Sequence, residues 1–253
     1  MKTLFQISSD FSNDTNQIRQ KIYDKENYFK FLKNLKPNYK KVYIDILIGY
    51  FAVFLSIILS FKLIEVKLIN TFFILLISIN IGFWIAYITL FLHEASHFNL
   101  SKNKKINNVL SNIFIGWFSG TEVNSYRKIH FEHHKHLGET TDTETSYFEE
   151  LNSLTIIKFI TGIHSLKTFN KRNKTLQKNN GTKNFSMMYF FISLILHVFI
   201  LLILLNINIY SAISWILGVW CFFPLFAALR QLLEHRDENA NPNKNYSKEN
   251  HGA

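Results

Sequence analysis

The sequence predicts an all-α integral membrane protein, with four transmembrane helices in two hairpins and a cytoplasmic, histidine-rich helical cap. The chain has 253 residues, and 48% of them are hydrophobic, although its mean hydropathy is only +0.05. The apolar residues gather in long runs, which are separated by stretches rich in Lys and Asn. Such segregation is typical of a chain that crosses a bilayer several times. Most of the 10 histidines lie between the second and third runs.

Four apolar runs are each long enough to cross a bilayer as a helix. They cover residues 42–61, 68–92, 185–205 and 209–229. At ~1.5 Å per residue, each reaches roughly the 30 Å of the hydrocarbon core. Residues 106–118 are predicted to form a short re-entrant or interfacial helix, and residues 151–169 an amphipathic helix lying on the membrane. A cytoplasmic arm (1–41) and a cytoplasmic tail (237–253) flank a membrane domain (42–236).

The distribution of basic residues predicts the orientation of the chain. Of 28 Lys and Arg residues, 26 lie in the arm, in the central stretch of residues 98–184 and in the end of the chain from Arg230 onward, and 2 lie in the link of residues 62–67. The positive-inside rule then places both termini and the central stretch in the cytoplasm, and we expect a multi-pass protein of the cell inner membrane. The net charge of +10 lies in these loops without any nucleic-acid-binding motif, so we expect no nucleic-acid partner.

Histidines form three groups that this topology brings to the cytoplasmic side. His93 and His97 are four residues apart at the end of the second run, and residues four apart share a face of a helix. His130, His133 and His134 form a second group with the spacing His-x-x-His-His, which again predicts one face of a helix, and His235 closes the fourth run. Neutral imidazole suits iron, zinc and copper, but five or six imidazoles exceed the four ligands of tetrahedral zinc. The number of histidines therefore favours two metal ions.

The stretch from His93 to His97 also fits H-E-x-x-H, the signature of zinc metalloproteases, with Glu94 as the general base. A membrane zinc protease needs a third ligand, for which Glu234 is a candidate. That interpretation leaves the second histidine group unexplained, but it stays open as an alternative.

Together these motifs resemble those of the membrane fatty acid desaturases. The pair His93 and His97 resembles the first histidine box of that family, and His130, His133 and His134 resemble the second. The resemblance extends through the flanks, from Phe91 to Phe148, and to the end of the fourth run. It implies a diiron centre that uses molecular oxygen and external electrons to introduce a double bond into an acyl chain of a lipid. The implied partners are the membrane, an acyl or lipid substrate, and an electron-transfer protein such as a ferredoxin or cytochrome.

The resemblance also implies the residues of the site. The metal ligands would be His93, His97, His130, His133, His134 and His235. Gln231, His136, Glu94 and Glu132 are expected beside these ligands, as partners of the imidazoles. Asp142 and Glu144 are expected to pair with Arg127, to recognise a headgroup, or to be solvated.

Two further functions remain open within this resemblance. Close relatives in the family hydroxylate a chain with the same ligands, and a degenerate relative would bind metal without catalysis. The family pattern ends with a third histidine box, which again has the spacing His-x-x-His-His. This sequence has no such box after His235. We therefore expect that the natural protein continues past Ala253 and carries that box.

Overall fold

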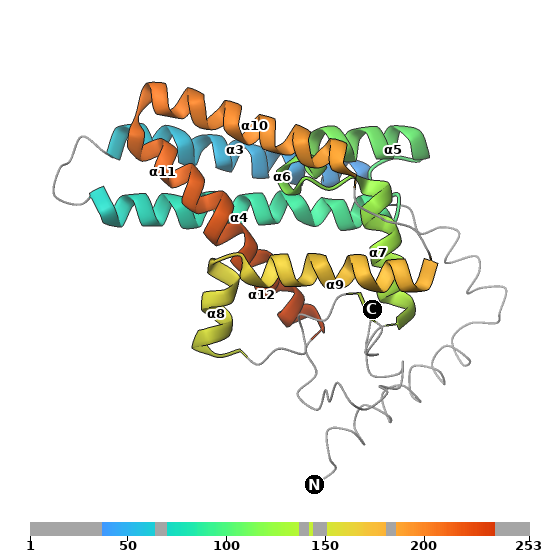
Figure 1. Ribbon diagram of the computed structural model, residues 1–253. Helices are drawn as coiled ribbons and strands as arrows, with labels where there is room; N and C mark the ends of the chain where they lie inside the picture. The colour runs from blue at the N-terminus through green and yellow to red at the C-terminus, as the bar shows by residue number, and fades with distance from the viewer. Residues whose placement is uncertain (1–36, 64–69, 137–141, 144–150, 181–185, 236–253) are drawn as a thin grey trace, which may run out of the picture.

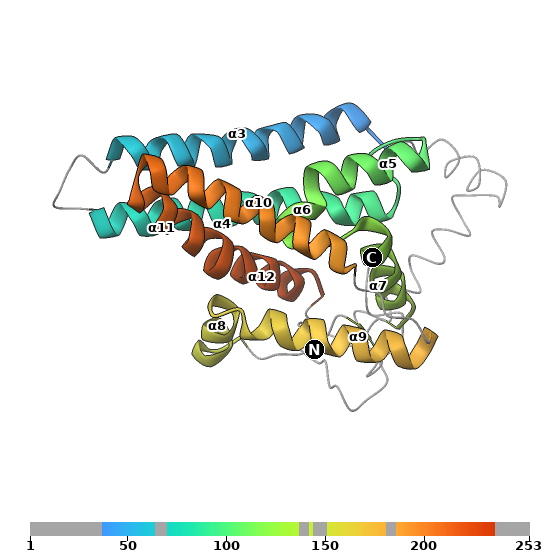
Figure 2. The ribbon, with the colours of Figure 1, turned by 45° about the horizontal axis from the view of Figure 1, so that its top comes forward.

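The computed structural model describes residues 37–63, 70–136, 142–143, 151–180 and 186–235. All regular structure in these ranges is helical, as the sequence predicts. Figures 1 and 2 show long helices running side by side, with α7 (Val123–His136) lying across one end of them and α9 (Ile163–Asn180) running in nearly the same direction as α4 below the bundle.

Four helices are long and apolar enough to span a membrane, which confirms the four predicted runs. They are α3 (Tyr39–Leu63), α4 (Asn70–Ser96), α10 (Met187–Ile207) and a fourth helix built from three segments in succession, which are α11 (Ile209–Leu217), η3 (Gly218–Phe222) and α12 (Phe223–His235). Large apolar side chains on the outer faces of these helices, such as Leu47, Phe51 and Phe199, are exposed in the protein alone. In a bilayer such faces contact lipid, while the backbone of each helix satisfies its own hydrogen bonds.

Helix α4 is the central element of the bundle, because it contacts α3, α11, η3 and α12. Its buried isoleucines are Ile77, Ile81, Ile85 and Ile88. Spacings of three and four residues place these side chains along one stripe of the helix. The stripe packs among the neighbouring helices. In the most apolar 18-residue stretch of α4, 39% is buried, which is the largest share among the four spans. This packing fixes the position of the α4 end that carries His93.

The fourth span contains a π-helical segment, η3, in place of one regular turn. The Phe223 N–H donates to the Gly218 carbonyl, five residues back instead of four. Pro224 follows at once, and a proline has no N–H to donate and crowds the preceding turn. The wider turn relieves this crowding, and the span continues as α12 beyond it.

The α4 helix and η3 cross so closely that glycine is required on both sides. A Cβ added at Gly82 would lie 2.7 Å from Phe223 N and 2.8 Å from Gly218 O, and both of these are backbone atoms. We expect Gly82→Ala to destabilise the protein by roughly 1–3 kcal/mol or more, because the helices must move apart. Leu76→Ala is the control, because Leu76 lies on the same helix but is 44% exposed, away from this crossing. Thermal unfolding in detergent tests this expectation, and equal melting temperatures of Gly82→Ala and the wild type would contradict it.

The two shorter predicted helices exist with different boundaries. The stretch 106–118 forms a nearly continuous helical segment from α5 (Lys104–Ser111) through η1 (Asn112–Gly116) to α6 (Trp117–Ser119). The single helix predicted for 151–169 is wrong, because the chain forms α8 (Ser153–Ile160) and α9 instead. Gly162 separates the two helices with a φ of 73°, a left-handed conformation that ends a helix and favours glycine.

Candidate metal centre

The first histidine pair lies where α4 ends. The helix stops at Ser96, and Phe98 follows with a φ of 62°. The Asn99 N–H donates to the Glu94 carbonyl at 2.9 Å, which is the capping pattern of a helix that ends in a left-handed residue. His93 is therefore on the last turn of α4, whereas His97 is just beyond it. The expectation that α4 continues through both histidines is wrong by one residue, but the tight turn keeps them together, with ring centroids 5.1 Å apart.

Arg127 attaches the second histidine helix, α7, to this end of α4. Its guanidinium donates to the carbonyl oxygens of Ser96 at 2.8 Å and Ala95 at 3.0 Å, which are among the last carbonyls of the helix. Its carbon atom also lies 4.0 Å from the centre of the Phe98 ring. A cation at the carboxyl end of a helix interacts favourably with the helix dipole. Arg127 thus positions His130, which follows it by three residues.

All five histidines of the two motifs gather between α4 and α7. The Nε2 atom of His130 lies 2.9 Å from the Nε2 atoms of both His97 and His134. One nitrogen each from His93, His97 and His130 lies within 4.8 Å of the others, which is close enough to hold one metal ion. The His133 ring centroid is 5.7 Å from that of His134 and 6.2 Å from that of His130. The structure thus joins two groups that are 33 residues apart in the sequence.

The chemistry of this cluster fits a metal. When two nitrogens each bind one ion at ~2.1 Å, with a right angle at the ion, the nitrogens lie about 3 Å apart. The Nε2 atom of His130 lies at nearly this distance, 2.9 Å, from the Nε2 atoms of His97 and His134. Burial, and secondarily the neighbouring histidines, lower the pKa of His130 to about 2. Its imidazole is therefore neutral near pH 7, and the neutral form is the one that binds a metal. Five imidazoles in contact also exceed the ligands of one tetrahedral zinc ion.

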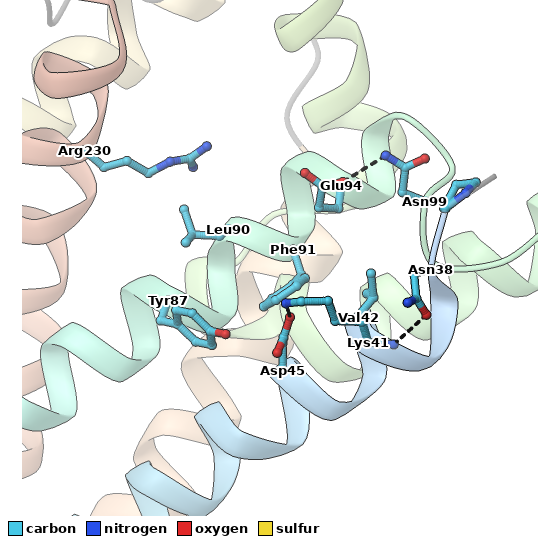
Figure 3. Close-up of a pocket in the computed structure, with 11 residues that line it drawn as sticks. Asn38, Lys41, Val42, Asp45, Tyr87, Leu90, Phe91, Glu94, Asn99 and Arg230 are labelled. Atoms are coloured by element: carbon cyan, nitrogen blue, oxygen red, sulfur yellow. Dashed lines mark hydrogen bonds and ion pairs between the residues drawn. The ribbon is translucent and has the colours of Figure 1, made fainter. Parts of the chain in front are cut away.

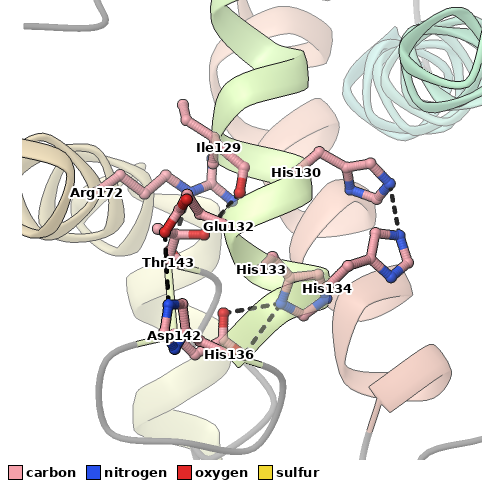
Figure 4. A network of polar contacts seen from close by, with 9 residues as sticks. All are labelled: Ile129, His130, Glu132, His133, His134, His136, Asp142, Thr143 and Arg172. Carbon is pink, nitrogen blue, oxygen red and sulfur yellow. Dashed lines mark hydrogen bonds and ion pairs between the residues drawn. The ribbon is translucent and has the colours of Figure 1, made fainter. Parts of the chain in front are cut away.

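Asp142 is a site residue whose role the sequence analysis did not identify. His133 Nδ1 lies 2.8 and 3.0 Å from the two carboxylate oxygens of Asp142, and both side chains are almost completely buried. Figure 4 shows the carboxylate facing the ring. The expected pairing of Asp142 with Arg127, its exposure to solvent and its contact with a headgroup are therefore wrong. A carboxylate at Nδ1 fixes the tautomer that leaves Nε2 as the metal-binding atom.

The other residues expected beside the ligands have mixed outcomes. The His136 ring lies 3.5 Å from a Glu132 carboxylate oxygen, so these two contact each other one helical turn apart (Figure 4). Glu94 accepts a hydrogen bond from the Asn99 amide at 2.8 Å. Gln231 is partly buried on α12. None of these contacts tests whether the residues support the histidines, which stays a prediction.

Two candidates lie partly or wholly outside the described residues. His235 is the last residue of α12, but its side chain is outside the described part, so its role as a ligand stays a prediction. Glu144 lies in the range 144–150, which is also outside it, as is the tail from residue 236 onward.

Two further histidines, one buried and one half-buried, have structural partners away from the cluster. His164 contacts Phe159 edge to face, with ring centroids 4.6 Å apart, and lies 3.2 Å from the Thr168 hydroxyl. His197, within α10, lies 3.2 Å from the Phe118 carbonyl. Such a hydrogen bond inside the bundle is what a polar side chain in a transmembrane helix requires.

Comparison with known proteins gives one match. The family model described as fatty acid desaturase matches residues 70–251, which include both histidine groups, the fourth span and His235. Neither the search of curated proteins nor the search of solved structures gave a match. The family match covers more than half of the chain, and it agrees with a multi-pass helical protein that brings histidines together at the end of its spans. The chain therefore belongs to the fatty acid desaturase family.

Proposed function

We propose that the protein is an oxygen-dependent desaturase that introduces a double bond into an acyl chain of a lipid at a histidine-bound diiron centre. The single observation that supports this best is the cluster of five histidines from α4 and α7. Bound iron would supply the oxidising power to remove two hydrogens from an unactivated chain, with molecular oxygen as oxidant and electrons from a ferredoxin or cytochrome.

The residues of the chain would divide the work as follows. His93, His97, His130, His133 and His134 would hold the metal, with His235 as a sixth ligand. Asp142 would orient His133 through its Nδ1, and Arg127 would hold α7 against the end of α4. The apolar faces of the spans lie in the bilayer that contains the substrate lipid, so the acyl chain would reach the cluster without crossing water.

The zinc protease is the weaker alternative. His130 lies with His93 and His97 in one group, and His134 touches His130, so the H-E-x-x-H pair is part of a larger imidazole cluster. The Glu94 carboxylate, the general base of a protease, accepts a hydrogen bond from Asn99. A base that activates a metal-bound water must instead face that water.

Lipid analysis of cells that express the complete gene product tests the proposed reaction. We expect a double bond in acyl chains that the same cells lack without the gene, and no such product from the His130→Ala variant. A new hydroxyl group would identify a hydroxylase instead. No change in any lipid, in cells that contain correctly folded and iron-loaded protein, would contradict both reactions.

The metal itself distinguishes the desaturase from the protease. We expect purified full-length protein to contain about two iron ions per chain, because the imidazoles exceed one tetrahedral set. Elemental analysis of protein grown with balanced iron and zinc measures this. One zinc ion per chain, together with peptide cleavage that Glu94→Gln abolishes, would favour the protease.

The proposed topology has both termini and the histidine cluster in the cytoplasm. In a Cys221→Ser background, we expect Lys62→Cys to react with an impermeant maleimide added to intact cells. Asn180→Cys should react only after the cells are permeabilised, because the basic central stretch is retained inside. Each variant is the control for the other. Labelling of Asn180→Cys, but not of Lys62→Cys, in intact cells would show the opposite topology and contradict the proposal.

A further inference from the structure

A pocket of about 550 Å³ lies beside the histidine cluster, on another side of α4. The start of α3, the last two turns of α4 and Arg230 of α12 line it. Figure 3 shows Glu94 on α4 and Asp45 on α3 bordering the pocket, with Arg230 extending toward it from α12. Its volume falls within the roughly 300–1,000 Å³ of small-molecule sites. None of the described lining residues is a histidine of the cluster, so the pocket is distinct from the cluster of His93, His97 and His130.

The pocket combines two cations with two carboxylates. Lys41 Nζ lies 2.7 Å from an Asp45 carboxylate oxygen, and Glu94 accepts from the Asn99 amide at 2.8 Å. Arg230 supplies the second cation. The formal charge of the described lining residues is therefore zero, although four charged groups face the same space. Such a site offers donors to a phosphate and acceptors to an ammonium group at the same time.

The same pocket also has an apolar wall. Tyr87, Leu90 and Phe91 contribute it from α4, and Val42 contributes from α3. These residues belong to the ends of two candidate spans, where charged groups meet the start of the apolar helix faces. A ligand that fits both features has a polar head carrying both charges and an apolar chain that continues along the spans.

We propose that this pocket binds the zwitterionic headgroup of a phospholipid, namely a phosphate ester with an ammonium group, whose acyl chain is the substrate. Arg230 and Lys41 would contact the phosphate, and Glu94 and Asp45 would contact the ammonium group. A carrier with several phosphates would require a surplus of positive charge, which the described part of the lining does not provide. The statement that the bound lipid is the substrate depends on the proposed function, whereas the binding site itself does not.

The test measures lipid binding without turnover. Full-length protein is equilibrated in detergent with equal amounts of phosphatidylethanolamine and phosphatidylglycerol, and native mass spectrometry then counts the lipids that stay bound. We expect about a tenfold preference for phosphatidylethanolamine, the effect of roughly one charge-assisted hydrogen bond. Glu94→Gln should reduce this preference severalfold, because it removes a charged acceptor for the ammonium group. Arg230→Gln should instead weaken the binding of both lipids, because both carry the phosphate. Lys40→Gln and Glu122→Gln are the matched controls, because neither residue lines the pocket, and both should keep the wild-type ratio.

Two results would overturn the inference. Equal or tighter binding of phosphatidylglycerol would show a site for anionic lipid, and an unchanged preference in Glu94→Gln would place the selectivity elsewhere. The His130→Ala variant, which lacks a metal ligand, should keep the preference. If the preference holds while cells form no new double bond, the proposed function fails and the headgroup site stands. If a double bond forms but the purified protein shows no preference, the headgroup site fails alone.

Discussion

Replacing His130 with Ala should remove iron from the protein and abolish its activity. The Nε2 atom of His130 lies 2.9 Å from those of both His97 and His134, so its ring touches residues of both histidine groups. Loss of an outer partner of a ligand already costs roughly 10–100-fold in metal affinity. We therefore expect loss of this ligand to cost at least about a hundredfold, since metal binding also orders the helices that carry the cluster.

Iron content after purification and product formation in cells both measure the effect of His130→Ala. His164→Ala is the matched control, because His164 is also a buried histidine, but its partners are Phe159 and Thr168 instead of the cluster. Gel filtration must show that both variants remain folded. If both variants retain the iron content of the wild type, the cluster is not the iron site.

The second large effect is expected from Asp142→Asn, which nearly preserves volume but removes one buried negative charge. The carboxylate holds the Nδ1–H of His133, and without its charge the imidazole is a weaker ligand and is free to take the other tautomer. We expect the affinity for iron to fall by roughly 10–100-fold, although all the histidines remain. Titration of the metal-free protein with ferrous iron gives this affinity directly.

Asp142 acts by positioning His133, so the test must separate this role from general stability. Thr143→Val is the matched control, because Thr143 is the next residue and equally buried, but its hydroxyl donates to the Ile129 carbonyl instead. We expect Asp142→Asn to change iron affinity far more than melting temperature, and Thr143→Val to do the reverse. Unchanged iron affinity in Asp142→Asn would show that the buried pair serves folding alone.

The sequence alone predicted the four spans because crossing a bilayer is a local property. A run of apolar residues either has the length to span the hydrocarbon or does not, whatever its neighbours are. The predicted runs therefore match α3, α4, α10 and the fourth span, with differences of a few residues at the ends. The spacing of His130, His133 and His134 likewise predicted a shared helical environment, because periodicity along a helix is fixed by its geometry.

Interactions between elements depend on how helices cross, and only the tertiary structure decided them. The sequence placed both histidine groups on one side of the membrane, but their contact depends on Arg127 at the end of α4. For Asp142 the sequence left open a pairing with Arg127, a headgroup contact or exposure to solvent, yet the residue is buried against His133. The close approach at Gly82 and the pocket between α3, α4 and α12 also arise only from packing. The physical reason is that a hydrogen bond or a close contact requires positions accurate to a fraction of an ångström, whereas hydropathy and spacing give only the length and the face of each helix.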